Sequence, residues 1–294
     1  MMKKSIFKNP WLPYLLIAPQ MIVVLVFFFW PAFDSLRLSV FKVSPFGDRQ
    51  IFVGLDNFID LLTSPEYYRS VYHSFVFSLG VTFLGLAVSL FLALLANQKI
   101  RGLTFYRSAI LWTFGIAPPV AGIIWLFIFH PSYGILSYFL AKITAYEFNW
   151  LLKGWIALLL IIFAATWAHL GYNVAFFLAG LQTIPNSIVD AAKVDGASGF
   201  RLFRWITFPL LSPVTFFLFI MNMVFSFFET FGIIHAVTQG GPGDTTTIMV
   251  YKAYVDGFVH LRMGLSAAQS VILMALVIFL TMLQFRYTER KVFY

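Results

Sequence analysis

The sequence has no cysteine among its 294 residues, which excludes disulfides, thiolate metal sites and cysteine nucleophiles. Charged residues are also scarce: they make up 11% of the chain, against roughly 25% in an average soluble domain. Hydrophobic residues, by contrast, make up 60% and aromatic residues 19%. A single globule of this length cannot hide so many apolar side chains from water, so the composition predicts a membrane protein.

The formal net charge of +8 could indicate a nucleic-acid-binding protein. However, the basic residues are scattered at the ends of apolar runs, and they form no basic stripe with interleaved aromatic residues. This distribution is typical of a protein that crosses a membrane several times. We therefore expect no nucleic-acid partner.

Six apolar runs are long enough to cross a hydrocarbon core of roughly 30 Å as helices. They predict an all-α polytopic fold with six transmembrane helices in one domain over residues 1–294. The first run follows a lysine-rich start but is too long for a signal peptide, and no small-residue cleavage site follows it, so it predicts an uncleaved anchor. The predicted spans are approximately Trp11–Phe33, Phe75–Ala96, Ala109–Phe129, Trp155–Leu181, Val214–Ile234 and Ala267–Phe285.

The distribution of lysine and arginine between the loops predicts the orientation. With the N-terminus inside, the inner segments hold twelve of the 20 basic residues and the outer segments hold eight, although the inner segments are together much shorter. Because lysine and arginine are enriched in cytoplasmic loops, we expect both termini in the cytoplasm. The loop 182–213 between the fourth and fifth spans is then cytoplasmic as well. On the outer side, the stretches "FVGLDNFIDLL" and "YGILSYFLAKIT" each predict a short helix.

The loop 182–213 is polar although it lies between two long apolar runs. Pro185 interrupts the fourth helix, and Ser187 followed by Asp190 predicts a capped start of a new one. Gly196 and a second glycine three residues later allow a sharp bend, after which "FRLFRWI" predicts a second short helix. From these properties alone, an interfacial amphipathic loop remains as good an interpretation as a docking element.

The spacing within this loop resembles the signature loop of ABC importer permeases. The family pattern is Glu-Ala-Ala, three residues, Gly, nine residues, Ile, one residue, Leu-Pro. Here all the spacings agree, and two residue types differ, with Asp in place of Glu and Phe in place of Leu. The matching positions are Asp190, Ala191, Ala192, Gly196, Ile206, Phe208 and Pro209.

The resemblance implies that this loop contains the coupling helix, which docks into a groove of a separate cytoplasmic ATPase. The docking surface would then be formed by Asp190, Ala191, Ala192 and Gly196, with Ile206 and Pro209 completing the motif. Consistent with this, the chain has no G-x-x-x-x-G-K-[ST] phosphate loop. We expect that this chain is a transport subunit, not an enzyme, and that it binds no metal or cofactor. ATP and magnesium would bind to the partner ATPase.

Further stretches resemble the carbohydrate-uptake branch of these importers, which includes the maltose-type permeases. They are "GGPGDTTTIMVYKAY" and "GLDNF". Within this branch, the opening "WLPYLLIAPQ" and the C-terminal stretch from "YKAYVDGF" onward are most similar to permeases for sn-glycerol-3-phosphate, which implies transport of that ester or its diesters. The alternative is a neutral sugar or disaccharide. The implied location is the bacterial inner membrane, and the implied partners are a second permease, two ATPase subunits and an outer solute-binding protein.

Polar side chains inside the spans are the candidate lining of a substrate pathway, because they are costly in lipid. His169, Tyr172 and Asn173 share one face of the fourth span with Thr166, and Asn222, Ser226 and Glu229 share one face of the fifth. At about 1.5 Å per residue, His169 lies roughly 18 Å from the cytoplasmic end of its span, close to mid-bilayer. Such residues also hold helices together, and this second role is expected for Ser74, Ser78 and Thr82 of span two.

No lysine or arginine lies within any predicted span, although a phosphate group usually binds guanidinium or ammonium groups. Three interpretations stay open: the partner permease supplies the cations, the site holds the polyol end, or the substrate is not a phosphate ester. Only His169 could carry positive charge in these two faces. A membrane-embedded hydrolase is disfavoured, because neither H-E-x-x-H nor G-x-S-x-G occurs.

Overall fold

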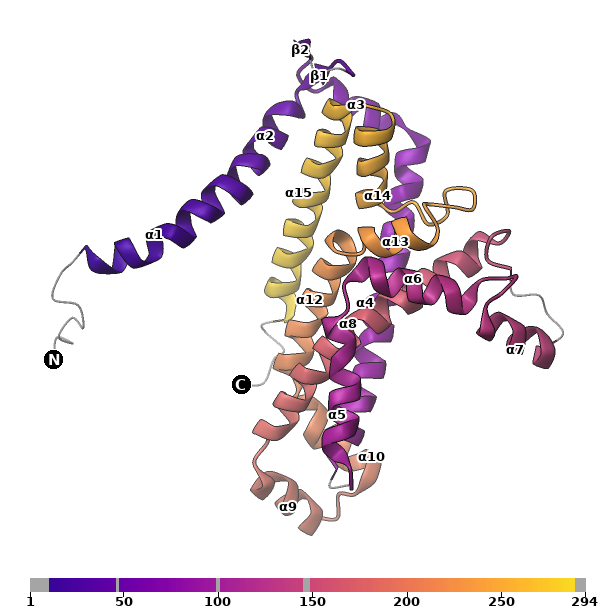
Figure 1. Ribbon diagram of the computed structural model, residues 1–294. Coiled ribbons are helices and arrows are strands. Elements are labelled where there is room, and N and C mark those ends of the chain that lie inside the picture. Colours follow the sequence, from indigo (N-terminus) through magenta and orange to yellow (C-terminus); the bar gives the residue numbers. More distant parts are fainter. Residues whose placement is uncertain (1–10, 46–47, 99–100, 145–148, 289–294) are drawn as a thin grey trace. The chain divides into compact units, whose positions relative to one another are not determined.

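The computed structural model describes residues 11–45, 48–98, 101–144 and 149–288, and within these residues the chain is mainly helical (Figure 1). It divides into two compact units. The first unit comprises residues 1–63 and 253–272, and the second comprises residues 64–252 and 273–294. Helices α14 (Met249–Tyr254) and α15 (Met263–Thr288) each contribute residues to both units.

The first unit begins with a 27-residue apolar helix that runs from Leu12 to Leu38. It comprises α1 (Leu12–Val24), a π-helical turn (Leu25–Phe29) and α2 (Trp30–Leu38). None of its most apolar window is buried within the protein, which fits a helix whose side chains face lipid. The predicted first span is confirmed as a helix, and it continues five residues beyond Phe33.

A small hairpin and a short helix follow in the same unit. Strands β1 (Phe41–Val43) and β2 (Gln50–Phe52) pair antiparallel with Phe41 opposite Phe52, and α3 (Asp56–Thr63) confirms the predicted helix in "FVGLDNFIDLL". Asn57 fixes α3 to this region, because its Nδ2 donates hydrogen bonds to the carbonyl oxygens of Ser39 and Phe41.

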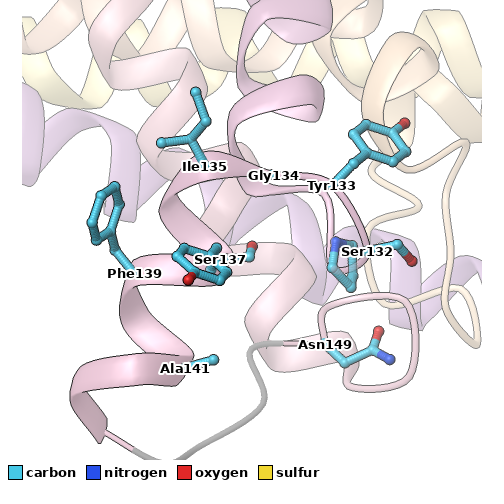
Figure 2. Close-up of a pocket in the computed structure, with 10 residues that line it drawn as sticks. Ser132, Tyr133, Gly134, Ile135, Ser137, Phe139, Ala141 and Asn149 are labelled. Carbon is cyan, nitrogen blue, oxygen red and sulfur yellow. The ribbon is translucent and has the colours of Figure 1, made fainter.

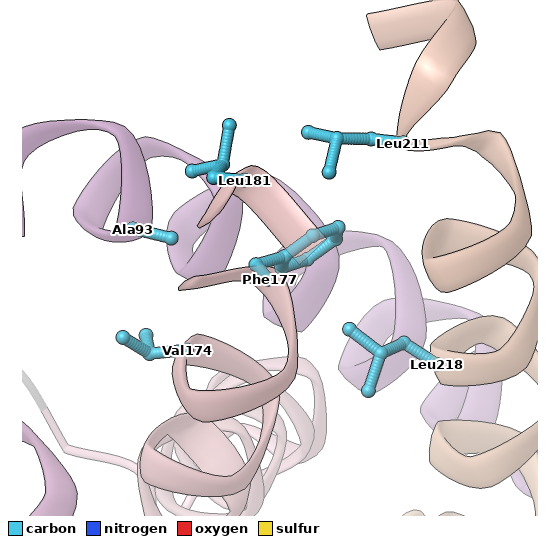
Figure 3. Packing of buried hydrophobic residues seen from close by; sticks show 6 residues of the cluster. All are labelled: Ala93, Val174, Phe177, Leu181, Leu211 and Leu218. Carbon is cyan, nitrogen blue, oxygen red and sulfur yellow. The ribbon is translucent and has the colours of Figure 1, made fainter. Parts of the chain in front are cut away.

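Three long helices form the centre of the second unit. They are α4 (Pro65–Ala96), α8 (Gly154–Thr183) and α12 (Ser212–Phe228), and each packs against the other two (Figure 1). Figure 3 shows part of their contact, where the fully buried Phe177 of α8 packs with Leu211 and Leu218. Lipid is as apolar as these side chains, so close packing holds such helices together more than release from water does. Helices α4 and α8 confirm that the second and fourth predicted spans are helical.

The third predicted span, Ala109–Phe129, is wrong as a continuous helix. Helix α5 (Leu103–Leu111) leads into a 3-10 turn (Trp112–Gly115), and α6 (Pro118–Phe129) then leaves at 107° to it. The break occurs at Pro118 and Pro119, which have no amide hydrogen for a helical bond. A residue that precedes proline is also driven to extended backbone, and Ala117 has ψ 139°.

The fifth predicted span, Val214–Ile234, is also broken. Helix α12 ends at Phe228, and α13 (Phe231–Val237) begins three residues later. Helix α13 packs against α6 at a close contact, since a Cβ atom added to Gly232 would lie 2.6 Å from Cγ of Pro119. Only glycine lets the two helices approach this closely. The segment after the end of α12 therefore packs directly on the start of α6.

The remaining helices agree with the sequence. Helix α15 confirms that the sixth predicted span is helical, and α7 (Ile135–Thr144) confirms the predicted helix in "YGILSYFLAKIT". Among the described residues there are four helices that could cross a membrane alone, and six spans if each of two bent pairs counts as one. The second bent pair has its 68° bend at Leu211, between residues 199–210 and α12.

Candidate functional site

The loop 182–213 forms a helix–turn–helix at one end of α8 and α12 (Figure 1). Its first helix is α9 (Asn186–Val194), followed by α10 (Gly199–Leu202), a π-helical turn (Phe203–Thr207) and α11 (Phe208–Leu210). The predicted cap at Ser187 is wrong, because α9 begins one residue earlier and Pro185 occupies the capping position without a side-chain hydrogen bond. The predicted second helix is confirmed.

Gly196 has the backbone conformation that ends α9. Its φ is +84°, in the left-handed region that side chains disfavour, and a Cβ atom there would have no neighbour within 4 Å. The amide of Gly196 donates to the Lys193 carbonyl, and the amide of Ala197 donates to that of Ala192. These two bonds form a Schellman cap. Glycine is therefore required at this position by conformation, not by lack of space.

The motif residues of α9 differ in exposure. Asp190 and Ala191 are exposed, as is Gly196, and Asp190 pairs with Lys193 at 3.2 Å. An exposed pair of this kind contributes only about 0–1 kcal/mol, so it leaves the carboxylate free to exchange partners. Ala192 was predicted to be part of the docking surface, but it is buried, with 8% of its surface exposed. On the second helix, Ile206 and Pro209 are half-buried.

Large exposed apolar side chains in this loop were not predicted to contribute to a surface. Val194 is 87% exposed, and Phe200 and Trp205 are 76% and 68% exposed. The guanidinium of Arg204 lies 5.5 Å from the centre of the Trp205 ring. The sequence signal for them was an apolar residue on a polar helix, which is ambiguous on its own because isolated exposed apolar residues are common.

A cavity of about 300 Å³ lies where the two helix breaks of the second unit meet α8. His169, Tyr172 and Glu229, all predicted pathway residues, line it. The remaining lining was missed by sequence reasoning, because it comes from the unpredicted break before α6 and from apolar residues of α8 and α12. It consists of Phe114, Ile116, Pro118, Ala168, Met221, Val224 and Phe225.

His169 is held between two aromatic rings in this cavity. Its imidazole stacks on Phe225 at 4.1 Å between ring centres and on Tyr172 at 4.7 Å. The residue is 9% exposed, and its Nε2 atom has no hydrogen-bond partner among the described residues. A buried nitrogen without a partner is costly, which makes it a candidate to bind a polar ligand.

The cavity lining has an unusual charge for a site that would admit a phosphate ester. Glu229, exposed at the end of α12, is its one acidic side chain, and no lysine or arginine is among the described residues that line it. The cavity thus offers a carboxylate, a phenol and an imidazole together with apolar and aromatic surface.

Asn173, Asn222 and Ser226 do not line this cavity in the structure. The two asparagine side chains exchange a pair of hydrogen bonds between α8 and α12, and both residues are fully buried. Ser226 is hydrogen-bonded to Ser78 of α4. These three predicted pathway residues therefore form part of a polar contact between helices, which is the alternative role for such residues in a membrane.

Ser74, Ser78 and Thr82 of span two were expected to hold helices together. The first two form hydrogen bonds to other elements. Ser78 pairs with Ser226, and Oγ of Ser74 accepts a hydrogen bond from the Met249 amide at 2.8 Å. Thr82 is fully buried on the same face of α4. A glycine completes this contact, since a Cβ atom at Gly85 would lie 3.2 Å from Oδ1 of Asn222.

A second, larger cavity of about 690 Å³ lies at the connection between α6 and α7 (Figure 2). Tyr133, Ser137 and Phe139 are among its lining residues, together with Asn149 beyond α7. It contains none of the predicted pathway residues and touches neither α8 nor α12. For these reasons the smaller cavity is the candidate site.

Comparison with known proteins gives consistent results. A family model described as "Binding-protein-dependent transport system inner membrane component" matches residues 85–294, which is more than half of the chain. The sn-glycerol-3-phosphate transport system permease protein UgpA of Rhizobium meliloti (strain 1021) is 49% identical over 293 residues, covering 100% of both chains. The protein of the same name from Escherichia coli O157:H7 is 46% identical over 99% of this chain and 98% of its own length.

Solved structures give the same fold. A chain of a bacterial ABC transporter involved in the import of the acidic polysaccharide alginate matches with a TM-score of 0.78 at 21% identity, covering 95% of this chain and 96% of that one. A chain of the alginate transporter in complex with an alginate pentasaccharide-bound periplasmic protein matches with a TM-score of 0.80 at 18% identity, covering 95% and 94%. The sequence matches, together with this fold, lead to one conclusion: the chain belongs to the family of binding-protein-dependent transport system inner membrane components.

Proposed function

We propose that this chain is one of the two permease halves of an ATP-driven importer for sn-glycerol-3-phosphate or its diesters. The observation that carries this proposal is the 49% identity, over the whole of both chains, to a permease named for sn-glycerol-3-phosphate transport. The chain would form half of the translocation pathway and carry out no chemistry on the substrate.

The partners follow from what an importer of this family requires. A second permease would complete the pathway, and an outer solute-binding protein would deliver the substrate, as the family description and the alginate complex suggest. Two ATPase subunits would bind ATP and magnesium, in keeping with the absence of a phosphate loop from this sequence. Both termini would lie in the cytoplasm, as the excess of basic residues on that side favours.

The loop 182–213 is proposed as the element that docks on the ATPase. Its exposed surface includes Asp190, Ala191 and Gly196, and Ala192 would support it from within. The loop joins α8 directly to the segment that leads into α12. A displacement of the loop would therefore act on both helices that line the cavity, which couples ATP-driven movement to the substrate pathway.

The 300 Å³ cavity is proposed as this chain's part of the pathway. His169, Tyr172 and Glu229 would contact substrate there, while Asn173, Asn222 and Ser226 would keep the helices in register. Transporter sites often lie where membrane helices are broken, because freed backbone and polar side chains can then face a cavity. Two helix breaks contribute to this one.

A neutral sugar or disaccharide is the second candidate substrate. It is favoured by the lack of lysine and arginine in the described lining of the cavity, since a neutral polyol needs no cation. The two candidates differ in what they require from the complex, and direct transport measurements separate them.

The test is uptake by the complete importer in proteoliposomes, with the binding protein and ATP supplied. We expect ATP-dependent uptake of radiolabelled sn-glycerol-3-phosphate and of a glycerophosphodiester, and none of maltose. Omission of ATP, or of the ATPase subunits, is the control. Uptake of maltose without uptake of either phosphate ester would replace the proposal with the second candidate.

A further inference from the structure

We infer, on the basis of the proposed function, that the cavity of this chain binds the hydroxyl-bearing glycerol end of the substrate, while the phosphate lies outside this chain's lining. The inference assigns a specificity-determining role to Glu229, Tyr172 and His169. It rests on the charge, the aromatic surface and the backbone of the cavity.

The charge of the cavity opposes a phosphate and suits hydroxyl groups. Glu229, the one acidic group in the described lining, repels an anion but accepts hydrogen bonds from hydroxyls. No lysine or arginine is present in the described lining to offset this repulsion. Nε2 of His169, buried and without a described partner, can form one more hydrogen bond with a hydroxyl group.

The aromatic surface gives a polyol a place to pack. Tyr172 contacts both His169, at 4.7 Å between ring centres, and Phe114, at 5.5 Å. Phe225 closes the other side of the imidazole. Ligand sites commonly combine such apolar walls with a few polar groups that fix orientation. The C–H groups of glycerol can contact these rings while its hydroxyls reach the carboxylate, the phenol and the imidazole.

The backbone at the two helix breaks offers little to an anion. Helix α6 begins with Pro118 and Pro119, so two of the N–H groups that a helix start would present to a phosphate are missing. The N–H group of Ala121, two residues after Pro119, already donates to the Ala117 carbonyl. Glu229 follows the C-terminal end of α12, where the helix dipole is negative. The start of α6 thus lacks two donors that an anion would bind, and the end of α12 favours a hydrogen-bond-donating group.

The experiment compares two substrates that share the glycerol end but differ in charge at the phosphate: sn-glycerol-3-phosphate, a monoester, and glycerophosphocholine, a diester with less negative charge on its phosphate. Kinetics of ATP-dependent uptake are measured for the complete importer carrying Glu229→Gln or Tyr172→Phe. We expect each variant to lower kcat/KM about 10-fold for both substrates, because Glu229→Gln weakens and Tyr172→Phe removes a hydrogen bond to the same end of each substrate. The ratio between the two substrates should stay within about twofold of wild type.

Tyr72→Phe is the matched control, because Tyr72 is an exposed tyrosine of α4 that does not line the cavity, and uptake by this variant should stay near wild type. Co-elution of all subunits and basal ATP hydrolysis establish that each variant assembles. Tyr172→Phe removes only an oxygen atom and serves if Glu229→Gln does not assemble. The inference is overturned if Glu229→Gln speeds monoester uptake relative to the diester, or if both variants leave both substrates unchanged. A wild-type importer that takes up neither ester would instead contradict the proposed function.

Discussion

Asn173 of α8 and Asn222 of α12 bind each other through both ends of their side-chain amides. Nδ2 of Asn173 donates to Oδ1 of Asn222 at 2.9 Å, and Nδ2 of Asn222 donates to Oδ1 of Asn173 at 2.8 Å. Asn222 also donates to the Leu218 carbonyl. Both residues are fully buried. The pair satisfies polar groups that would otherwise be stranded between two apolar helices, and so it fixes the register of α8 against α12.

This pairing predicts strong coupling between the two positions. Asn173→Leu or Asn222→Leu should each lower the free energy of unfolding by about 1–2 kcal/mol, because each leaves a buried amide without its partner. The double variant should cost less than the sum of the two, since no orphaned amide remains across the interface. Denaturant unfolding of the purified complex in detergent measures all three. Strict additivity would show that the two amides do not stabilise each other.

The division between cavity and helix contact predicts the accessibility of cysteines placed in the chain. Tyr172→Cys and Glu229→Cys should react with a water-soluble thiol reagent, because both residues line the cavity. Asn222→Cys should stay inert, because that position is fully buried. The native sequence has no cysteine, so labelling reports only the introduced residue. Rapid labelling at position 222 and none at 172 or 229 would reverse the assignment.

The proposed coupling loop requires a residue that can adopt the left-handed conformation at position 196. Gly196→Val should destabilise the end of α9 by about 1–2 kcal/mol, because the residue has φ +84°. We expect loss of ATPase co-elution or of substrate-stimulated ATP hydrolysis, while the membrane helices stay folded. Gly196→Asn is the matched control, since asparagine tolerates the left-handed region. Normal ATPase behaviour in the valine variant would exclude a role for this turn in coupling.

Asp256 lies in the first unit, within the turn that joins α14 to α15, and we expect its buried carboxylate to stabilise this turn. Its carboxylate accepts a hydrogen bond from Nε2 of Gln269 at 2.5 Å and lies 3.1 Å from Nδ1 of His260. Asp256 is 3% exposed, whereas the His260 side chain is 52% exposed. Asp256→Ala should therefore cost about 2–3 kcal/mol of stability.

His260→Ala serves as the control for this anchor, and it should cost less than about 1 kcal/mol because the pair is screened by solvent on that side. Thermal unfolding of the complex compares the two variants. Equal losses would show that the histidine contact, and not burial of the carboxylate, carries the stability.

Most of the architecture follows from the sequence, because apolar length is enough to predict a membrane helix. The first, second, fourth and sixth predicted spans are confirmed as apolar helices for this reason. The break at Pro118 was also present in the sequence, but a continuous apolar run concealed it. The end of α12 at Phe228 has no comparable local signal. The helix that follows it, α13, packs closely on α6 where Gly232 meets Pro119, and such a contact between separate helices cannot be read from a local pattern.

The loop between the fourth and fifth spans was predictable because its glycines and prolines act locally. Gly196 can end α9 because glycine adopts the left-handed conformation without a steric penalty, and this freedom is a property of the residue itself. Ala192 was not predictable in the same way, because its burial depends on what packs against α9.

The roles of the polar residues in the spans were decided only by the tertiary structure. Tyr172 and Asn173 are neighbours in sequence, and helical periodicity places both near one face. A single residue step turns a helix by about 100°, which is enough to separate a residue that lines the cavity from one that contacts the next helix. The sequence determined that polar groups occur at these depths. Which of them face the cavity depends on where α4 and α12 pack around α8, because a buried polar group takes whatever partner the neighbouring helix provides.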